Sequence, residues 1–229
     1  MIRHALILAA GRGERMRPLT DHTPKPLLQV RGQRLIEWHL QALAAAGVRE
    51  VVVNTAWLEE QFEPALGDGS RWGLHLHWSR EGRDHGGALE TAGGIAKALP
   101  LLDEVFWVVS GDVFLPGFVF DARPAQAVIE GQHLAHLWMV PNGAHHPCGD
   151  FSLGDDGLLG MQADLPRLTW ASVGLFHRAM FESLQVGERL SLRPLLERAI
   201  TQRRLGGTRW AGAWADVGTP DRLASLQQD

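Results

Sequence analysis

The sequence predicts an α/β fold with a mixed, mostly parallel sheet and helices on both faces. Short aliphatic runs at residues 5–9, 51–53 and 105–109 have the length and composition of buried strands. Amphipathic segments lie between these runs, and this rhythm is typical of parallel strands joined by crossover helices. A chain of 229 residues can bury a sizeable core as one domain, so we expect a single domain over 1–229.

Strand and helix patterns alternate through the first half of the chain. After the strand at 5–9, a helix is predicted over 35–46, where Leu35, Leu40 and Leu43 recur near helical spacing and Gly47 ends the pattern. The elements predicted next are a strand at 51–53, a helix at 57–66, an exposed strand at 74–78, a helix at 91–99 and a strand at 105–109.

Strands predominate after Gly131, with few helices between them. Thr219 followed by Pro220 is a typical helix start, with an N-cap residue and a proline at the first helical position. The predicted elements are strands at 134–140, 150–153, 158–161 and 169–176, a helix at 192–203, a short strand within 210–217 and a helix at 219–226.

Composition limits the classes of partner. The net charge of −4 and the isoelectric point near 6.2 argue against nucleic acid or an anionic membrane as the main partner. No apolar run approaches the roughly 20 residues of a membrane span, and Cys148 is the only cysteine, which fits a reducing compartment. We expect a cytoplasmic protein that is a monomer or a small homo-oligomer.

The end of the first strand carries the strongest functional signal. Residues 8–20 read Leu-Ala-Ala-Gly-Arg-Gly-Glu-Arg-Met-Arg-Pro-Leu-Thr, and Pro24-Lys25-Pro26 follows. Glycines let a ligand approach the backbone, and free N–H groups with clustered cations are typical of a polyphosphate site. We therefore predict that this loop binds a nucleoside triphosphate; its cations are Arg12, Arg15, Arg17 and Lys25.

Two familiar phosphate-binding loops are excluded. No lysine follows a glycine as a P-loop requires, and Met16 stands where a dinucleotide-binding loop has its third glycine. Prolines at 18, 24 and 26 prevent a continuous helix after the loop. The phosphates should therefore meet a long basic loop and not a helix N-terminus.

Two aspartates follow apolar runs next to glycines. Asp112 comes after the 105–109 strand and Gly111, and Asp216 precedes Val217-Gly218-Thr219. Mg²⁺ takes one or two carboxylates together with phosphate oxygens and waters, which suits this pair. Alone, Asp112 could be a turn residue and Asp216 a distal helix cap. Because ligands of α/β sheets bind beyond the carboxyl ends of strands, Gly11 and Asp112 should converge.

These motifs together resemble the signature of the sugar-phosphate nucleotidyltransferases. The matching stretches are Ala9-Ala10-Gly11-x-Gly13-x-Arg15-Met16, Pro24-Lys25-Pro26, Gly111-Asp112 and Trp214-Ala215-Asp216-Val217-Gly218-Thr219. The resemblance implies a Rossmann-like, GT-A-like fold and a Mg²⁺-dependent enzyme. Such an enzyme joins a nucleoside triphosphate to a sugar 1-phosphate and releases pyrophosphate.

The resemblance also assigns roles to residues. Residues 1–130 would form the nucleotide-binding half and 131–229 the sugar-phosphate-binding half. Arg15 and Lys25 would be catalytic, and Asp112 and Asp216 would bind the metal. The expected nucleotide-binding residues are Ala9, Ala10, Gly11, Gly13, Glu14, Arg15, Lys25, Asn54, Leu89, Glu90 and Gly94, and the expected sugar-phosphate residues are Gly111, Gly149, Asp150 and Asp164.

Some of these residues have a second interpretation. In the family, the stretch 89–94 lies over the nucleobase, and the alternative is that its glycines serve tight helix–strand packing. Asn54 could contact the base or sugar, or cap the next turn. His145, His146 and Cys148 have no partner pair elsewhere, so we expect them to line the acceptor cleft and not to bind zinc.

The chain looks most like the compact bacterial N-acetylmuramate-1-phosphate uridylyltransferases of peptidoglycan recycling. Stretches 53–57, 66–70, 89–91 and 145–151 contribute to this likeness. It favours UTP and N-acetylmuramic acid 1-phosphate. The alternatives are GTP with mannose 1-phosphate, dTTP with glucose 1-phosphate, a cytidylyltransferase for phosphocholine, and a non-catalytic nucleotide sensor. Residues 81–88 depart from the family by their length, and we expect them to form a mobile flap.

Overall fold

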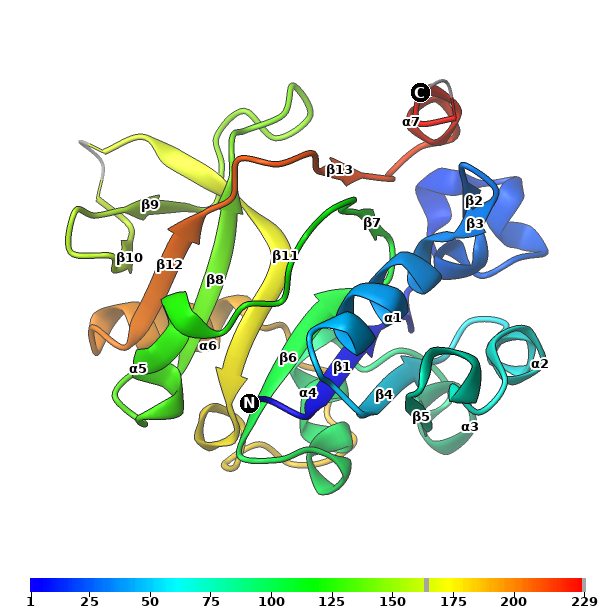
Figure 1. Cartoon of the computed structure of the whole chain (residues 1–229), viewed down its shortest axis with the longest axis horizontal. Coiled ribbons are helices and arrows are strands. Elements are labelled where there is room, and N and C mark those ends of the chain that lie inside the picture. Colours follow the sequence, from blue (N-terminus) through cyan, green and yellow to red (C-terminus); the bar gives the residue numbers. More distant parts are fainter. Residues whose placement is uncertain (163–164, 228–229) are drawn as a thin grey trace.

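The computed structural model describes residues 1–162 and 165–227 and is built around one large mixed sheet (Figure 1). Four strands of its first half are parallel, in the spatial order β6-β1-β4-β5. They are β1 (His4–Leu8), β4 (Glu50–Thr55), β5 (His75–Arg80) and β6 (Val105–Ser110).

The second half continues the sheet from β6 with a different strand direction. The long strand β11 (Arg167–His177) runs antiparallel to β6 and pairs on its other side with β8 (Ala135–Val140). The sheet then extends through β12 (Leu205–Arg209), which is parallel to β8, and through β9 (Phe151–Leu153) and β10 (Leu159–Gly160).

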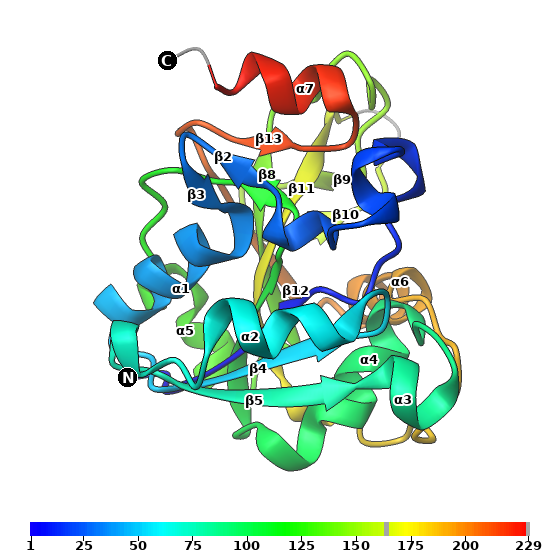
Figure 2. The same cartoon turned by 90° about the vertical axis from the view of Figure 1, so that its right-hand side faces the viewer.

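Helices cover both faces of this sheet. Their bounds are α1 (Leu35–Ala45), α2 (Phe62–Leu66), α3 (Glu81–His85), α4 (Glu90–Ala98), α5 (Gln126–Ile129), α6 (Arg193–Thr201) and α7 (Pro220–Ser225). Two small antiparallel pairs lie above the main sheet, β2 (Gln29–Val30) with β3 (Gln33–Arg34), and β7 (Val113–Phe114) with β13 (Ala215–Asp216). Figure 2 shows α7 at the top of the molecule, above β13, β2 and β3.

The core follows from the two-residue period of the strands. In β1, Ala5 and Ile7 pack into one apolar cluster with residues of α1, whereas Leu6 points to the opposite face. That second cluster contains Ile95 of α4 and Leu196 of α6. The β1, β4 and β6 strands are therefore apolar on both sides, and the predicted α/β fold with helices on both faces is confirmed.

Two predicted segments differ from the structure, and the structure also contains elements that were not predicted. Residues 57–66 do not form one helix, because Leu58 has φ +49° and regular α-helix begins only at α2. Residues 81–88 are not an irregular loop throughout, since they begin with the helix α3, whose first residue Glu81 is fully buried. The strand β12 was not expected, because two of its five residues, Gly206 and Gly207, are poor strand formers.

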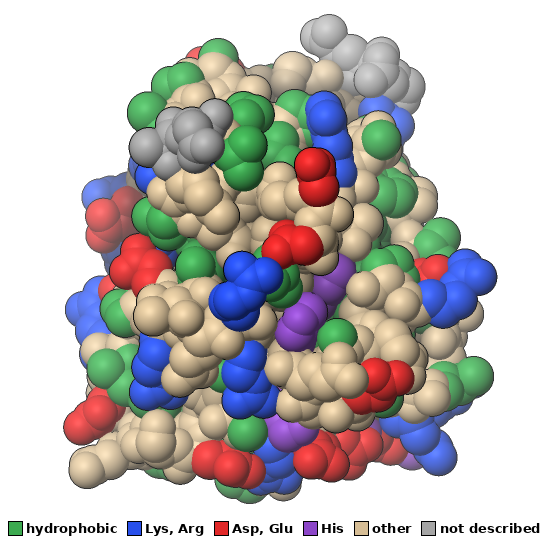
Figure 3. Space-filling model, turned by 90° about the vertical axis from the view of Figure 1, so that its left-hand side faces the viewer, with side chains coloured by type: hydrophobic (Ala, Val, Ile, Leu, Met, Phe, Trp, Pro, Cys, Tyr) green, Lys and Arg blue, Asp and Glu red, His purple; other side chains and the backbone are tan. Residues whose placement is uncertain are grey.

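Within the described residues, no helix combines the length and apolar character needed to cross a membrane. On the face shown in Figure 3, acidic and basic side chains are interspersed among neutral atoms.

Packing against α4 predicts the effect of one glycine substitution. A Cβ at Gly93 would lie 2.2 Å from the backbone oxygen of Glu188, so Gly93→Ala forces the two segments apart. We expect the free energy of unfolding to fall by about 1–3 kcal/mol, measured by urea denaturation. Gly87→Ala is the matched control, because a Cβ there meets nothing within 4 Å. Equal stability of the two variants would contradict this account.

A buried histidine predicts a pH dependence of stability. His136 on β8 lies against Thr208 Oγ1 at 2.8 Å, and burial lowers its pKa from 6.5 to about 4. The unfolded chain therefore binds more protons between these values, and the free energy of unfolding falls as the pH drops through that window. Between pH 7.5 and 5, the free energy of unfolding of His136→Gln should therefore fall by about 2 kcal/mol less than that of the unchanged protein.

Urea titrations at the two pH values measure this difference. The exposed His22→Gln variant serves as the control and should follow the unchanged protein. If His136→Gln also follows it, the buried ring does not carry the pH dependence.

Candidate active site

A cavity of about 540 Å³ opens at the carboxyl ends of β1, β4 and β6. Gly11 and Asp112 both line it, so the predicted convergence of these two strand ends is confirmed. We call it the donor cavity. Its other lining residues are Leu8, Ala9, Ala10, Arg12, Gly13, Glu14, Lys25, Pro26, Asn54, Ala88, Glu90, Thr91, Ser110 and Arg189.

The glycine-rich loop is held in place by three local contacts. Gly13 has φ +66°, which favours glycine, and its carbonyl accepts a hydrogen bond from Thr20 Oγ1 at 2.9 Å. The carbonyl of Thr20 accepts in turn from the Trp57 indole N–H at 2.8 Å. The Arg12 guanidinium lies 3.8 Å above the Trp57 ring, a cation–π contact that holds this charge at the cavity.

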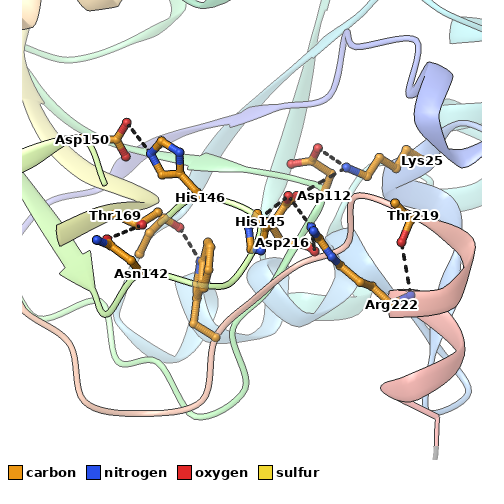
Figure 4. A network of polar contacts seen from close by, with 12 residues as sticks. Lys25, Asp112, Asn142, His145, His146, Asp150, Thr169, Asp216, Thr219 and Arg222 are labelled. Atoms are coloured by element: carbon orange, nitrogen blue, oxygen red, sulfur yellow. Dashed lines mark hydrogen bonds and ion pairs between the residues drawn. The ribbon is translucent and has the colours of Figure 1, made fainter. Parts of the chain in front are cut away.

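Lys25 lies between the two predicted metal ligands. Its ammonium group is largely buried and donates to Asp112 Oδ2 at 2.7 Å, and it lies 3.8 Å from Asp216 Oδ1 (Figure 4). The two aspartates are brought together by the β7–β13 pair, in which Asp216 stands opposite Val113. Both carboxylates therefore converge on one cation although they are distant in sequence.

Asp216 has two further neighbours whose nitrogen atoms face its carboxylate. Arg222 Nη1 on α7 donates to Asp216 Oδ2 at 3.1 Å, and His145 Nε2 lies 3.8 Å from the same oxygen. Thr219 caps α7 by accepting from the Arg222 backbone N–H. The helix α7, which follows Asp216 in the chain, thus supplies the Arg222 side chain that holds the Asp216 carboxylate in place.

The donor set suits Mg²⁺. Among the described residues, no group of three His, Cys, Asp or Glu side chains is placed to hold a metal ion. A pair of carboxylates that converges on one point needs ligands from substrate and water, and this is how Mg²⁺ usually binds beside phosphates. Asp112 and Asp216 therefore fit as its protein ligands.

The backbone beyond Asp112 is fixed by a buried histidine. His39 of α1 lies 2.9 Å from the Val113 carbonyl oxygen, and burial lowers the pKa of its ring to about 4. The ring is therefore neutral at pH 7, and its Nε2–H donates to the carbonyl. This contact ties the backbone next to Asp112 to the helix layer.

A second cavity of about 450 Å³ lies on the other side of Asp112. We call it the acceptor cavity. Asp112 and Ser110 line both cavities, so the two meet at these residues. The other residues of the acceptor cavity are Arg15, Val113, His145, His146, Asp150, Thr169, Trp170, Ser172, Trp214 and Asp216.

Asp150 is fixed at this cavity by backbone and side-chain contacts. Its Oδ2 accepts from the Trp170 backbone N–H at 2.8 Å, and its Oδ1 lies 3.2 Å from His146 Nε2. Gly149 has φ +61° and leaves no room for a Cβ beside Asn142. Ser172, also with positive φ, stands at a register shift in β11. Irregular backbone thus shapes the acceptor side.

Most of the predicted site residues line one of the two cavities. Ala9, Ala10, Gly11, Gly13, Glu14, Lys25, Asn54, Glu90 and Asp112 line the donor cavity, and Asp150 and Asp216 line the acceptor cavity. Arg15 lines the acceptor cavity and a smaller pocket next to Lys25, but not the donor cavity itself. Leu89, Gly94, Gly111 and Gly149 support the backbone without lining these cavities, and Asp164 lies outside the described residues.

The second interpretations of the glycine stretch and Asn54 can now be judged. A Cβ on Gly94 would meet Glu81 and Asn54, so this glycine serves packing. Asn54 uses its amide inside the protein, on Ala9 and Glu81, although it also lines the cavity.

Sequence reasoning did not assign roles to Arg12, His39 or Arg222. Arg12 was part of the basic loop, but only its contact with Trp57 shows that it faces the donor cavity. His39 and Arg222 act through contacts across the fold, and a helical sequence pattern gives no sign of them.

Comparison with known proteins agrees with this geometry. The model of the nucleotidyl transferase family matches residues 4–141. An N-acetylmuramate α-1-phosphate uridylyltransferase from Neisseria meningitidis is 49% identical over 97% of this chain and 96% of its own length. A protein of the same description from Caulobacter vibrioides is 32% identical over 94% of this chain and 92% of its own.

Solved structures share the fold at low sequence identity. A crystal structure described as a glucose-1-phosphate thymidylyltransferase from Bacillus anthracis has a TM-score of 0.80 and 19% identity, covering 99% of this chain and 94% of that one. The inositol-1-phosphate CTP transferase from T. maritima has a TM-score of 0.71, 18% identity and coverage of 99% and 97%. The solved structures show the fold, and the family model and the two relatives show that this chain belongs to the nucleotidyl transferase family.

Proposed function

We propose that the protein transfers a uridylyl group from UTP to N-acetylmuramic acid 1-phosphate and releases pyrophosphate. The observation that carries this proposal is that Asp112, paired with Lys25, lines both the donor cavity and the acceptor cavity. Two phosphates bound in the two cavities would meet at this residue. The choice of base and sugar rests on the 49% identity to the N. meningitidis uridylyltransferase.

The donor side would bind the nucleoside triphosphate through the glycine-rich loop. Backbone N–H groups and the Arg12 and Lys25 cations would hold the phosphates, with Arg15 on the β- and γ-phosphates. The 88–91 segment would lie over the base. Residues 1–130 would thus form the nucleotide half and 131–229 the acceptor half.

The transfer step needs no proton acceptor, because the sugar phosphate is already an anion at neutral pH. One of its oxygens attacks the α-phosphorus in line, the bond to the bridging oxygen breaks, and pyrophosphate leaves. Lys25 would offset the negative charge where the two phosphates meet, so positioning and electrostatics supply the catalysis. Mg²⁺ held by Asp112 and Asp216 would add charge compensation between the phosphates.

The biological setting follows from these substrates. N-acetylmuramic acid belongs to peptidoglycan, so we propose a role in peptidoglycan recycling. Because the donor is a nucleoside triphosphate, we propose the cytoplasm as its place.

Measuring pyrophosphate release with Mg²⁺ tests the proposal. The panel pairs four nucleoside triphosphates with N-acetylmuramic acid 1-phosphate, glucose 1-phosphate and mannose 1-phosphate. We expect fast turnover only with UTP and N-acetylmuramic acid 1-phosphate. Turnover with GTP and mannose 1-phosphate would keep the reaction and replace the substrates. Triphosphate binding without turnover on any sugar would indicate a sensor.

Two substitutions test the residues at the junction of the cavities. Lys25→Met and Asp112→Asn should each lower kcat by about 10²–10³, because a preorganised charge is removed where the phosphates react. Circular dichroism should show both variants folded. Asp155→Asn, an exposed turn position, is the control and should keep full activity. A kcat within twofold of the unchanged protein in either junction variant would exclude that residue from the roles given above.

A further inference from the structure

A chain of buried hydrogen bonds connects the two walls of the donor cavity. Asn54 Oδ1 accepts from the backbone N–H of Ala9 at 2.7 Å, and Asn54 Nδ2 donates to Glu81 Oε1 at 2.6 Å. Glu81 Oε2 accepts from the backbone N–H of Leu89 at 2.7 Å. The chain thus runs from the first residue of the glycine-rich loop to the segment that precedes α4.

Glu81 is the central member of this network. Its side chain is fully buried at the start of α3, and burial raises the pKa of its carboxyl group above the ordinary value. A buried carboxylate is costly unless hydrogen bonds satisfy it, and each of its two oxygens has one such partner. Nothing in the proposed reaction uses this group.

The surrounding backbone makes room for the network. A Cβ at Gly94 would lie 2.5 Å from Glu81 Oε1 and 2.7 Å from Asn54 Nδ2. A glycine, costly within a helix, therefore stands in α4 where the carboxylate needs space.

The Leu89 end of the network carries an unusual backbone. Glu90 has φ +64°, a left-handed conformation that is unfavourable for a residue with a side chain, and it lines the donor cavity. The adjacent Leu89 is held on both sides, by Glu81 at its N–H and by the Leu190 N–H at its carbonyl. These contacts keep the strained segment at the cavity wall.

We propose that Glu81 is a positioning residue that holds the glycine-rich loop and the 88–91 segment at the separation a nucleotide requires. It thereby sets the affinity for the nucleoside triphosphate without touching it. This inference rests on the proposed function, because it assigns the donor cavity to the triphosphate.

The isosteric variant Glu81→Gln tests the network. A glutamine can accept from only one of the two donors, so its own NH₂ group faces either Asn54 Nδ2 or the Leu89 N–H. Calorimetric titration with the triphosphate that the unchanged protein binds, in Mg²⁺ buffer, should show a dissociation constant raised about 10–100-fold. The KM for the sugar phosphate should not change. The exposed Glu60→Gln is the control and should bind as the unchanged protein does.

A reciprocal exchange separates positioning from mere folding. When Asn54→Asp is combined with Glu81→Gln, the new carboxylate accepts from the Ala9 N–H and from the NH₂ group of the new amide. The oxygen of that amide accepts from the Leu89 N–H, so every hydrogen bond is restored with one donor–acceptor pair reversed. Asn54→Asp alone brings two carboxyl groups together, and they can pair only by sharing a proton, so its triphosphate affinity should fall as the pH is raised. The double variant needs no such proton and should bind as the unchanged protein does at every pH tested.

Four results would overturn the inference. The first is an unchanged triphosphate affinity in Glu81→Gln, and the second is an equal loss of affinity for both substrates together with a lowered Tm. The third is a double variant that binds the triphosphate no better than the single variants, and the fourth is a double variant that does not fold. If Glu81→Gln does not fold, the double variant alone carries the test. If the unchanged protein binds none of the four triphosphates, the proposed function fails as well, so the two failures are distinguishable.

Discussion

The contact of Lys25 with two aspartates is the constraint on which the site depends. One ammonium group within reach of both Asp112 and Asp216 requires strands from the two ends of the chain to lie together, and the β7–β13 pair provides this. Arg222 donates to a carboxylate oxygen of Asp216. His39 holds Asp112 indirectly, through the carbonyl oxygen of the next residue, Val113. Without the Lys25 ammonium group, the Asp112 and Asp216 carboxylates would be two like charges without a common partner.

The donor cavity is positioned by regular structure, and the acceptor cavity is formed largely by irregular backbone. The donor side lies at the ends of parallel strands, where the sheet itself aligns the glycine-rich loop, Asn54 and Asp112. The acceptor side is formed by antiparallel strands with a register shift, and residues with positive φ shape its wall. Such a scaffold can keep the triphosphate site constant while the acceptor wall changes with the sugar.

The sequence predicted the parts of this molecule that depend on local patterns. Apolar runs located the strands, and the residues after them located the loop, Lys25 and both aspartates. It did not predict the role of Glu81, because a charged residue beside glycines is typical of a loop, while its burial depends on Asn54 and Leu89. Arg222 and β12 were missed for the same reason: each is defined by a partner distant in sequence. The structure places the short helix α3 at the start of residues 81–88, and the contacts of Glu81 with Asn54 and Leu89 lie at its first residue.

The position of Asp216 along the chain has a consequence for synthesis of the protein. The glycine-rich loop, Lys25 and Asp112 all belong to the first half of the chain, whereas Arg189, which also lines the donor cavity, belongs to the second half. The second carboxylate and the arginine that fixes it come from β13 and α7, which follow β8, β11 and β12 in the chain. A nascent chain therefore cannot bring the two carboxylates together until β13 is made and pairs with β7, and the proposed reaction would depend on that late step.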